Sequence, residues 1–306
     1  MLVQVYEIQT PRDAEACISA GVDHIGSVLP DKASWRDPVL RDTVQASAAT
    51  GAKSSLIPIF RDIEILFSVI DYYRPDYIHF CDNLTNASGK GISPEPFVQV
   101  QTRLKENFPE TGIIRSIPVP RPGAFPDFPV LDIAEAFLAT SDFFLIDTWV
   151  TEAPVAGYIG ITGVPSDWSL AAALTRWSPI PVILAGGLSP ENVHDALMAV
   201  KCDGADSCTQ TNRVDSDGKS VRFQKDFQRV ADFVTAVRRA DEALHREKKE
   251  LETRLQTLRS ELADREKALP AHSIRPHQIM AIEALEENIK SVEAELAQFR
   301  MAFTRD

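Results

Sequence analysis

The sequence Ile183-Leu-Ala-Gly-Gly-Leu-Ser-Pro-Glu-Asn-Val193 joins an apolar run to the start of a helical pattern. Ser189 before Pro190 marks the helix start, because a capping hydroxyl followed by proline suits the first turn. Glycines such as Gly186 and Gly187 let a backbone approach a ligand, and unpaired N–H groups at a helix N-terminus attract anions. The stretch therefore predicts a strand–turn–helix unit whose turn binds phosphate. A tight turn that needs glycine only for its own shape is the alternative.

Units of this kind, a short apolar run followed by a longer amphipathic run, recur up to about residue 240. The apolar runs show little polar alternation, which is typical of parallel strands covered on both faces. Strand–helix repetition predicts a parallel sheet. The expected strands are Leu2–Tyr6, His24–Leu29, Ser55–Phe60, Tyr77–Phe80, Ile113–Pro118, Phe143–Asp147, Pro181–Leu184 and Ala205–Cys208. The expected helices are Pro11–Ala20, Pro38–Thr50, Asp62–Tyr73, Pro94–Phe108, Val130–Thr140, Asp167–Trp177, Ser189–Val200 and Phe227–Arg239.

The number and size of these units predict a (β/α)8 barrel, the TIM-barrel class of α/β fold, over residues 1–240. The chain has 306 residues, of which 44% are hydrophobic and 25% charged, and this suits a globular protein with a core of barrel size. A doubly wound open sheet is the alternative. Five prolines between Ile117 and Pro129 predict a stiff loop after the fifth strand, because proline disfavours helices and central strands.

Residues 241–306 have a different pattern. Leucines recur in steps of three and four from Leu244 to Leu269, and apolar residues recur in the same way from Ile282 to Phe303. These two heptad seams predict an antiparallel α-helical coiled-coil hairpin, whose first helix continues the last helix of the barrel. The seams could close on each other, on the barrel or on a second subunit. We expect the hairpin to mediate self-association into a homo-oligomer.

Charge and composition restrict the partners. The formal net charge is −12 and Lys and Arg are not clustered, so the chain is not expected to bind nucleic acid. No stretch reaches the roughly 18 apolar residues of a membrane span, and the N-terminus lacks the pattern of a signal peptide. The four cysteines have neither zinc-site nor disulfide-framework spacing. We therefore expect a cytoplasmic protein with reduced thiols and with no metal or cofactor, acting on a small phosphorylated compound.

Polar side chains end the sixth and eighth expected strands. Asp147 closes an apolar strand, and a carboxylate in that position of a barrel is costly unless it is used or paired. Partial desolvation would raise its pKa and suit a general acid, whereas a capping or salt-bridged aspartate is the alternative. After the eighth strand, Ser207, Thr209 and Gln210 are candidate donors to phosphate oxygens, or ordinary loop residues.

The first strand ends in Tyr6 and Glu7, of which only one can point into the barrel. If Glu7 faces the pocket, it could act as a base opposite Asp147, because two carboxylates in different environments can divide acid and base roles. The Tyr6 phenol would be a poor base near neutral pH, since its reference pKa is about 10. Arg36, after the second strand, could bind a carboxylate or be a solvated surface arginine.

Several of these segments together resemble the phosphoribosylanthranilate isomerase family of tryptophan biosynthesis. The resemblance covers roughly residues 2–239, and it is carried by Val3–Ala14, Ala20–Gly26, Leu145–Thr148, Gly160-Ile-Thr-Gly163 with Asp167-Trp168, and Ile183–Val193. It implies a barrel enzyme that performs an Amadori rearrangement, turning an aminoaldose phosphate into an aminoketose phosphate. The hairpin beyond residue 240 is not part of that family's minimal barrel.

The resemblance also implies roles for individual residues. Asp147 would be the acid and Arg36 the ligand of the substrate's anthranilate carboxylate, with Gly186, Gly187, Thr162 and Gly163 in the phosphate-binding set. The departures are equally specific: Tyr6 replaces the family's catalytic cysteine, Glu7 replaces the glycine after it, and Gln210 replaces a glycine at the phosphate site.

Two functions follow from this pattern. The first is an isomerase of this kind, or a diverged lyase or isomerase acting on another phosphorylated sugar-like compound. Asp147 would then be the acid and Glu7, or less readily Tyr6, the replacement base. The second is a non-catalytic barrel that binds a phosphorylated ligand or a protein partner. The lost cysteine and the appended hairpin motivate this second hypothesis.

Overall fold

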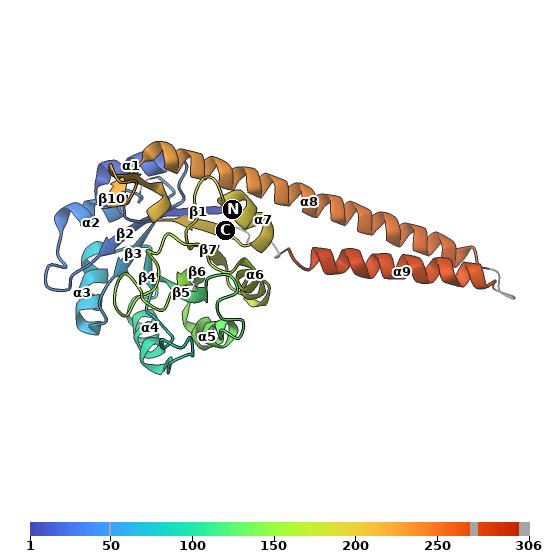
Figure 1. Ribbon diagram of the computed structural model, residues 1–306, viewed down its shortest axis with the longest axis horizontal. Coiled ribbons are helices and arrows are strands. Elements are labelled where there is room, and N and C mark those ends of the chain that lie inside the picture. The colour runs from blue at the N-terminus through green and yellow to red at the C-terminus, as the bar shows by residue number, and fades with distance from the viewer. Residues whose placement is uncertain (49, 270–274, 300–306) are drawn as a thin grey trace. The chain divides into compact units, whose positions relative to one another are not determined.

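The computed structural model describes residues 1–48, 50–269 and 275–299. Eight parallel strands close into a barrel in sequence order, with helices around the outside (Figure 1). The eighth strand pairs with the first, Val3 lying opposite Ala205, so the TIM barrel is confirmed over the open-sheet alternative. The strands are β1 (Leu2–Val5), β2 (His24–Leu29), β3 (Lys53–Pro58), β4 (Tyr77–Phe80), β5 (Gly112–Pro120), β6 (Phe143–Trp149), β7 (Val182–Leu184) and β8 (Gly204–Ser207).

The barrel helices begin where polar caps and prolines end the preceding loops. Thr10 and Asp37 accept hydrogen bonds from first-turn amides, and each precedes a proline. Helix α7 begins at Val193 rather than at the expected Ser189, because residues 189–192 form a turn first. The helices are α1 (Pro11–Ser19), α2 (Pro38–Gln45), α3 (Ile63–Tyr73), α4 (Glu95–Asn107), α5 (Val130–Phe137), α6 (Trp168–Trp177), α7 (Val193–Val200), α8 (Phe227–Lys267) and α9 (Pro276–Leu296), with short 3-10 helices η1 (Leu138–Thr140) and η2 (Thr209–Thr211).

Strand β5 continues through Pro118 and Pro120, so the expectation that the proline-rich loop begins at Ile117 is wrong. On one side β5 pairs with β6 as far as Pro120, but on the other side its ladder with β4 ends at Arg115. The last residues of β5 therefore have one edge without a partner strand. A proline's missing N–H breaks no ladder bond at such an edge.

A two-stranded antiparallel hairpin between β8 and α8 was not expected from the sequence. It consists of β9 (Asn212–Val214) and β10 (Ser220–Lys225). In its turn the Asp215 side chain accepts hydrogen bonds from two backbone amides, and Gly218 has a φ of 76°. The Asp-Gly pair at positions 217 and 218 was a sequence signal for this turn.

Tyr6, directly after β1, points into the barrel interior. Its Oη atom lies 2.5 Å from Ser55 Oγ and 2.7 Å from His79 Nδ1, and His79 Nε2 lies 2.7 Å from Ser116 Oγ. The ring is accommodated by Gly26 of β2, where a Cβ atom would lie 2.3 Å from the Tyr6 ring. A buried, hydrogen-bonded tyrosine thus fills the space behind the C-terminal ends of the strands.

The helical residues from Asp241 onward form a second compact unit, made by the end of α8 and by α9. The two helices run side by side in opposite directions (Figure 1). Leu251, Leu285 and Ile289 are buried, and Arg259 Nη2 and Glu293 Oε1 join the helices. The two heptad seams therefore close on each other within one chain. Part of the connection that carries Pro270 lies outside the described residues.

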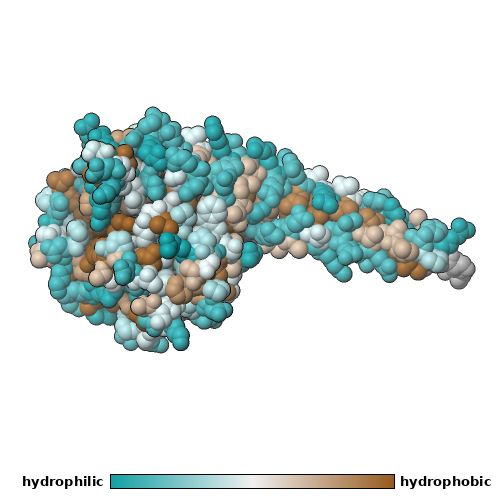
Figure 2. Space-filling view, viewed as in Figure 1, coloured by the Kyte–Doolittle hydropathy of each residue, from teal (hydrophilic) through white to brown (hydrophobic). Residues whose placement is uncertain are grey.

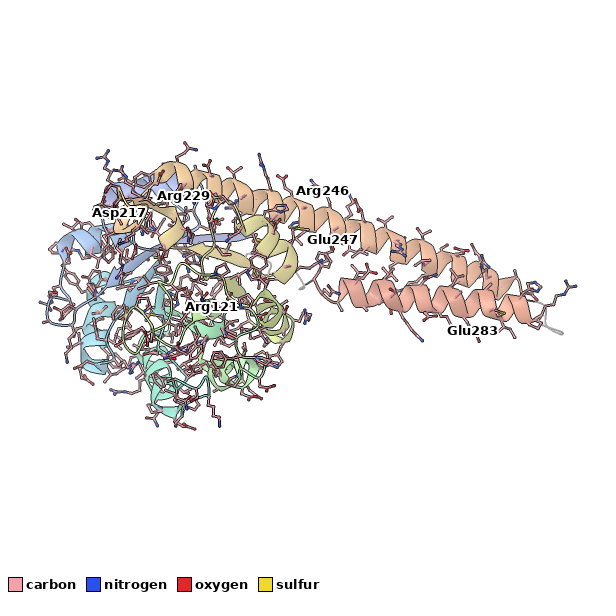
Figure 3. All side chains as sticks on the ribbon, in the orientation of Figure 1. Arg121, Asp217, Arg229, Arg246, Glu247 and Glu283 are labelled. Atoms are coloured by element: carbon pink, nitrogen blue, oxygen red, sulfur yellow. The ribbon has the colours of Figure 1, made fainter. Side chains whose placement is uncertain are left out.

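The outer surface of this helical hairpin is mostly polar, apart from the exposed Ile279 and Met280 of α9. Arg246 and Glu283 are exposed, and Figure 3 shows them with Glu247 on these helices. Figure 2 shows hydrophobic residues gathered along the middle of the hairpin, with hydrophilic residues to either side. Across the described ranges, every helix is too short or too polar to cross a lipid bilayer.

Candidate active site

A small cavity lies at the C-terminal ends of β6, β7 and β8, and its volume is about 30 Å³. Ligand pockets usually measure roughly 300–1,000 Å³, so this cavity is smaller than a typical ligand pocket. Asp147 and most of the expected phosphate-site residues meet here, but Ser207 does not line the cavity, and its hydroxyl donates to the Leu188 carbonyl instead. The lining residues are Asp147, Ile161, Thr162, Gly163, Ala185, Gly186, Gly187, Leu188, Asp206, Cys208, Thr209 and Gln210.

The turn after β7 presents backbone amides to this cavity. Gly186 and Gly187 have φ values of 86° and 60°, and within the described part of the chain their amides donate to no protein acceptor. Asn192 Nδ2 donates to the Gly187 carbonyl (3.0 Å), which fixes the orientation of that peptide. Unpaired amides in successive left-handed residues form a concave site that suits an anion.

Close packing against the loop after β6 requires glycine in this turn. A Cβ atom on Gly187 would lie 2.6 Å from the carbonyl carbon of Val164. Thr148 Oγ1 donates to the Val164 carbonyl (2.6 Å), and Gln210 Nε2 donates to the Gly163 carbonyl (3.0 Å). The loop, the turn and the start of η2 therefore form one continuous wall of the cavity.

The same loop carries backbone strain. Ile161, which lines the cavity, has a φ of 60°. A β-branched residue in the left-handed region is a genuine outlier, and such residues cluster at functional sites, where the surrounding contacts hold them in place.

Asp147 faces the cavity at the end of β6. Its Oδ1 atom accepts a hydrogen bond from the Thr148 amide (2.7 Å), and a Cβ atom on Gly160 would lie 2.2 Å from its Oδ2 atom. Burial raises the pKa of Asp147 to about 6, against the lowering effect of the Thr148 amide. No cation is bonded to this carboxyl among the described residues, so the alternative of a salt-bridged aspartate does not fit. A carboxyl in this range stays partly protonated at neutral pH and suits a general acid.

Asp206 of β8 is a cavity residue that the sequence analysis did not single out. Gln4 Nε2 donates to its Oδ1 atom (3.2 Å). Burial, followed by the charge of Asp147, raises the pKa of Asp206 to about 8. A signal was present, because Asp206 is an acidic residue inside the expected strand Ala205–Cys208.

Neither Tyr6 nor Glu7 lines the cavity. Burial raises the pKa of Tyr6 well above its usual value, so the phenol cannot serve as a base at neutral pH. Glu7, with a φ of 65°, accepts hydrogen bonds from Arg222 Nε (2.6 Å), Asn212 Nδ2 (2.7 Å) and the Phe223 amide (3.1 Å). Burial alone would raise the pKa of Glu7, but these three donors lower it. Glu7 therefore anchors the β9–β10 hairpin, and the structure does not place it opposite Asp147.

Arg36 is also away from the cavity. It is exposed in the loop after β2, and its guanidinium carbon lies 4.7 Å from the centre of the Trp35 ring and 5.9 Å from that of Tyr72. A carboxylate-binding role for Arg36 gains no support from this position. Among the described residues, no group of three His, Cys, Asp or Glu side chains is arranged to hold a metal ion.

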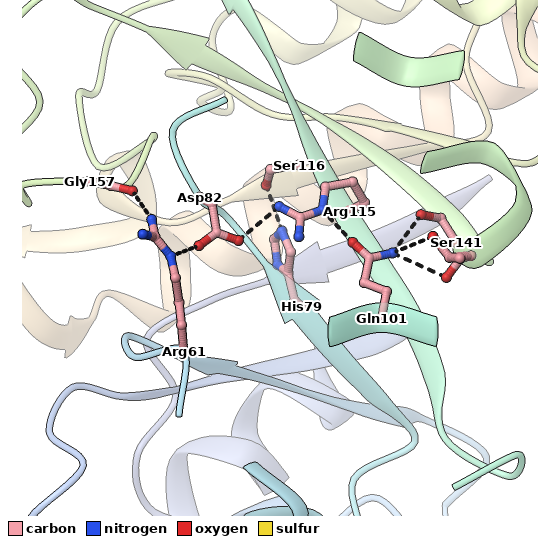
Figure 4. Close-up of polar contacts among 9 residues, drawn as sticks. Arg61, His79, Asp82, Gln101, Arg115, Ser116, Ser141 and Gly157 are labelled. Atoms are coloured by element: carbon pink, nitrogen blue, oxygen red, sulfur yellow. Dashed lines mark hydrogen bonds and ion pairs between the residues drawn. The ribbon is translucent and has the colours of Figure 1, made fainter. Parts of the chain in front are cut away.

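A buried ion-pair network ties the loop after β6 to the ends of β3 and β4 (Figure 4). Asp82 accepts from Arg61 Nε (2.5 Å) and from Arg115 Nη1 (2.9 Å), and Arg115 is fully buried. Arg61 also donates to the Gly157 carbonyl (2.9 Å), and its guanidinium carbon lies 5.3 Å from the centre of the Tyr158 ring. Arg61 therefore connects this loop to the end of β4, and we call its contacts with Asp82 and Gly157 the latch.

The fold and the candidate site define a class: a (β/α)8 barrel with a glycine turn after β7 that lines a cavity, and with carboxyl groups near the C-terminal ends of β6 and β8. The family described as N-(5'-phosphoribosyl)anthranilate (PRA) isomerase matches residues 98–235. The isomerase of that name from Methanosarcina acetivorans is 25% identical over 241 residues, which cover 77% of this chain and 92% of the relative.

Solved structures agree on the fold. The N-(5'-phosphoribosyl)anthranilate isomerase of Pyrococcus furiosus has a TM-score of 0.54 at 21% identity and covers 78% of this chain and 99% of its own. A phosphoribosylanthranilate isomerase in complex with reduced 1-(o-carboxyphenylamino)-1-deoxyribulose 5-phosphate has a TM-score of 0.54 at 17% identity, with coverage of 78% and 98%. Over its barrel, the chain is therefore similar to phosphoribosylanthranilate isomerases in sequence and in fold.

The packing of the β7 turn can be tested with two glycines that share a left-handed backbone. Gly187→Ala is expected to cost about 2–5 kcal/mol of unfolding free energy, from about 1–2 kcal/mol of backbone strain and about 1–3 kcal/mol of overpacking. Gly218→Ala, where nothing lies within 4 Å of the new Cβ atom, is expected to cost only the strain. Urea denaturation of both variants measures the difference, and equal losses would contradict the close contact with Val164.

The latch predicts a local effect of Arg61→Gln. Hydrogen exchange should become faster at the Asn83 and Ile159 amides, which donate to Gly157 and Cys81 across the contact between loop and strand. Arg103→Gln is the matched control, because Arg103 is an exposed arginine that pairs with Glu64 and stacks on Phe67 elsewhere. Unchanged protection of both amides in Arg61→Gln would show that the loop is held by other contacts.

Proposed function

We propose that this chain isomerises N-(5'-phosphoribosyl)anthranilate, the aminoaldose phosphate for which its relatives are named, to the corresponding aminoketose phosphate. The observation that carries the proposal is the pair of unpartnered amides at Gly186 and Gly187, which lie in the same cavity as the protonatable carboxyl of Asp147. A phosphate held by backbone amides and a proton donor in one site are what this rearrangement requires.

The phosphate group would bind at the β7 turn, where no lysine or arginine is among the described lining residues. Backbone amides then supply the positive end of the interaction. The loop and η2 would complete this site with Thr162, Gly163, Thr209 and Gln210. Asp147 would protonate the ring oxygen of the sugar, so that the ring opens and the amine nitrogen forms a double bond to C1.

A non-catalytic barrel is the less favoured alternative. A carboxyl held in a cavity without a bonded cation destabilises the fold, and selection for ligand binding alone would not require it. The cavity contains two such carboxyls, Asp147 and Asp206, beside an anion site that neither of them would help to fill. Proton transfer gives both groups a reason to be there.

Asp147→Asn tests the proposed proton donor, because it keeps the shape of the side chain and removes the acid. We expect kcat for N-(5'-phosphoribosyl)anthranilate to fall by about 10²–10⁴-fold. Asp217→Asn, an exposed aspartate of the β9–β10 turn, makes the same change of charge and serves as the control. Growth of a tryptophan auxotroph that lacks the isomerase gives a second readout. No growth with the wild-type chain and no turnover by the pure protein would remove this function.

Self-association through the hairpin and a cytoplasmic location complete the proposal. All four cysteines are free, as expected of a reducing compartment. Because the two seams close on each other, a homo-oligomer would have to form through the outer surface, where Ile279 and Met280 are exposed hydrophobic residues. Light scattering on the full chain and on residues 1–240 measures this. The same oligomer without the hairpin would refute its role.

A further inference from the structure

The cavity must contain a second group that moves protons, because the rearrangement needs a base as well as an acid. Among the described lining residues only Asp147, Asp206 and Cys208 can titrate. Burial raises the pKa of the Cys208 thiol far above neutral pH, so the reactive thiolate would be scarce. Asp206 is the remaining candidate.

The position of Asp206 suits this role. It lies on β8 opposite Gln4 of β1, with its side chain in the barrel interior beside the cavity. Gln4 Nε2 donates a hydrogen bond to Asp206 Oδ1, whereas Asp206 Oδ2 makes no hydrogen bond to any described residue. One oxygen is therefore anchored and the other is available to a ligand.

The two carboxyls also interact with each other. The charge of Asp147 disfavours ionisation of Asp206, in addition to the larger effect of burial. Apparent pKa values of about 6 and about 8 mean that the pair carries one proton between these two values. Because the pKa of Asp206 is the higher of the two, this proton lies mostly on Asp206, and the reactive form is the less populated one in which the proton lies on Asp147.

We propose that Asp206 is the second catalytic residue of this site, forming with Asp147 a carboxyl pair that does the work of the family's cysteine and aspartate. The assignment rests on the proposed isomerase function. Tyr6 fills the place of the cysteine and is tied to Ser55 and His79, which leaves proton transfer to the groups that line the cavity.

The proton transfers balance. Asp147 gives its proton to the ring oxygen as the C1–O bond breaks, and the nitrogen lone pair forms the C=N bond. The Asp206 carboxylate removes the proton from C2, and the C–H electron pair forms the C1=C2 bond while the C=N electrons return to nitrogen. Asp206 then delivers a proton to C1 as Asp147 takes the proton of the C2 hydroxyl. This leaves a ketone at C2 and returns both carboxyls to their starting states.

Asp206→Asn, assayed with substrate carrying deuterium at C2, is the sharpest test. We expect kcat to fall by about 10²–10⁴-fold, with KM changed much less, and the primary isotope effect on kcat to rise toward its intrinsic size because proton removal from C2 becomes rate-limiting. Asp147→Asn should lower kcat without raising the isotope effect, since it slows ring opening instead. Asp206→Glu should recover part of the activity, and Asp217→Asn is the control for charge.

The pH profile is an independent readout. In the wild type, kcat/KM should fall as the pH drops below about 6, where the base is protonated, and as it rises above about 8, where the acid is ionised. In Asp206→Asn, one of these two decreases of kcat/KM with pH should disappear. The other groups facing Asp206 are Gln4, Cys208, Tyr6 and Lys225, and burial lowers the pKa of Lys225.

Three results would overturn the assignment. The first is an Asp206→Asn enzyme that retains most of its kcat. The second is a loss of activity in a stably folded Asp206→Asn enzyme, verified by thermal melting, without the increased isotope effect. The third is the increased isotope effect in Cys208→Ser instead, which would make the thiol the base. If the wild type turns over no substrate, the proposed function fails, whereas turnover with an indifferent Asp206 removes only this inference.

Discussion

Two carboxyl groups share one small cavity at the barrel mouth, and the rest of the site depends on the cost of burying them. Asp147 and Asp206 end β6 and β8 on either side of the β7 turn, and no described residue forms an ion pair with either. Removing a carboxylate from water without a cation costs enough free energy that the group keeps its proton instead. The same burial that destabilises the fold therefore prepares both groups for proton transfer.

Enclosure of these carboxyls depends on three positions where a side chain cannot fit. Gly160 lies against the Asp147 carboxyl, Gly186 against Thr148, and Gly187 against the loop at Val164. All three have positive φ values, so both the backbone conformation and the close packing require glycine at these positions. Arg61 and Asp82 add an electrostatic contact at the far side of the loop.

The two residues that follow the first strand, Tyr6 and Glu7, have structural roles. Tyr6 enters the barrel interior over Gly26 and joins a hydrogen-bonded chain through His79. Burial lowers the pKa of His79 to about 3, so the chain is made of neutral groups. Glu7 faces the other way and fastens the β9–β10 hairpin through Arg222. One pair of neighbouring residues thus fills the core and anchors an insertion.

The barrel, the tight turn after β7 and the position of Asp147 at the barrel mouth were all predictable from local patterns. Apolar runs followed by capped helices are one-dimensional signals, and Gly186-Gly187 and Asp147 lie at the end of such runs. The directions of the Tyr6 and Glu7 side chains were not predictable. Side chains alternate between the two faces of a strand, so the sequence allows either residue to point inward. The space for the Tyr6 ring comes from Gly26 on the neighbouring strand. Arg36 followed the family pattern in sequence but stacks on Trp35 and Tyr72 instead.

The amino-acid order was thus sufficient for the architecture, since hydrophobic period, caps and turns act between near neighbours. It also marked where oxyanion chemistry could occur, because glycines and a carboxyl at strand ends are visible in one dimension. The cavity that Asp147 and Asp206 share, the contacts of Arg61 with Asp82 and Gly157, and the inward direction of Tyr6 exist only in the folded chain. They depend on contacts between strands that closure of the barrel brings together, and on burial, which no single position in a sequence reveals.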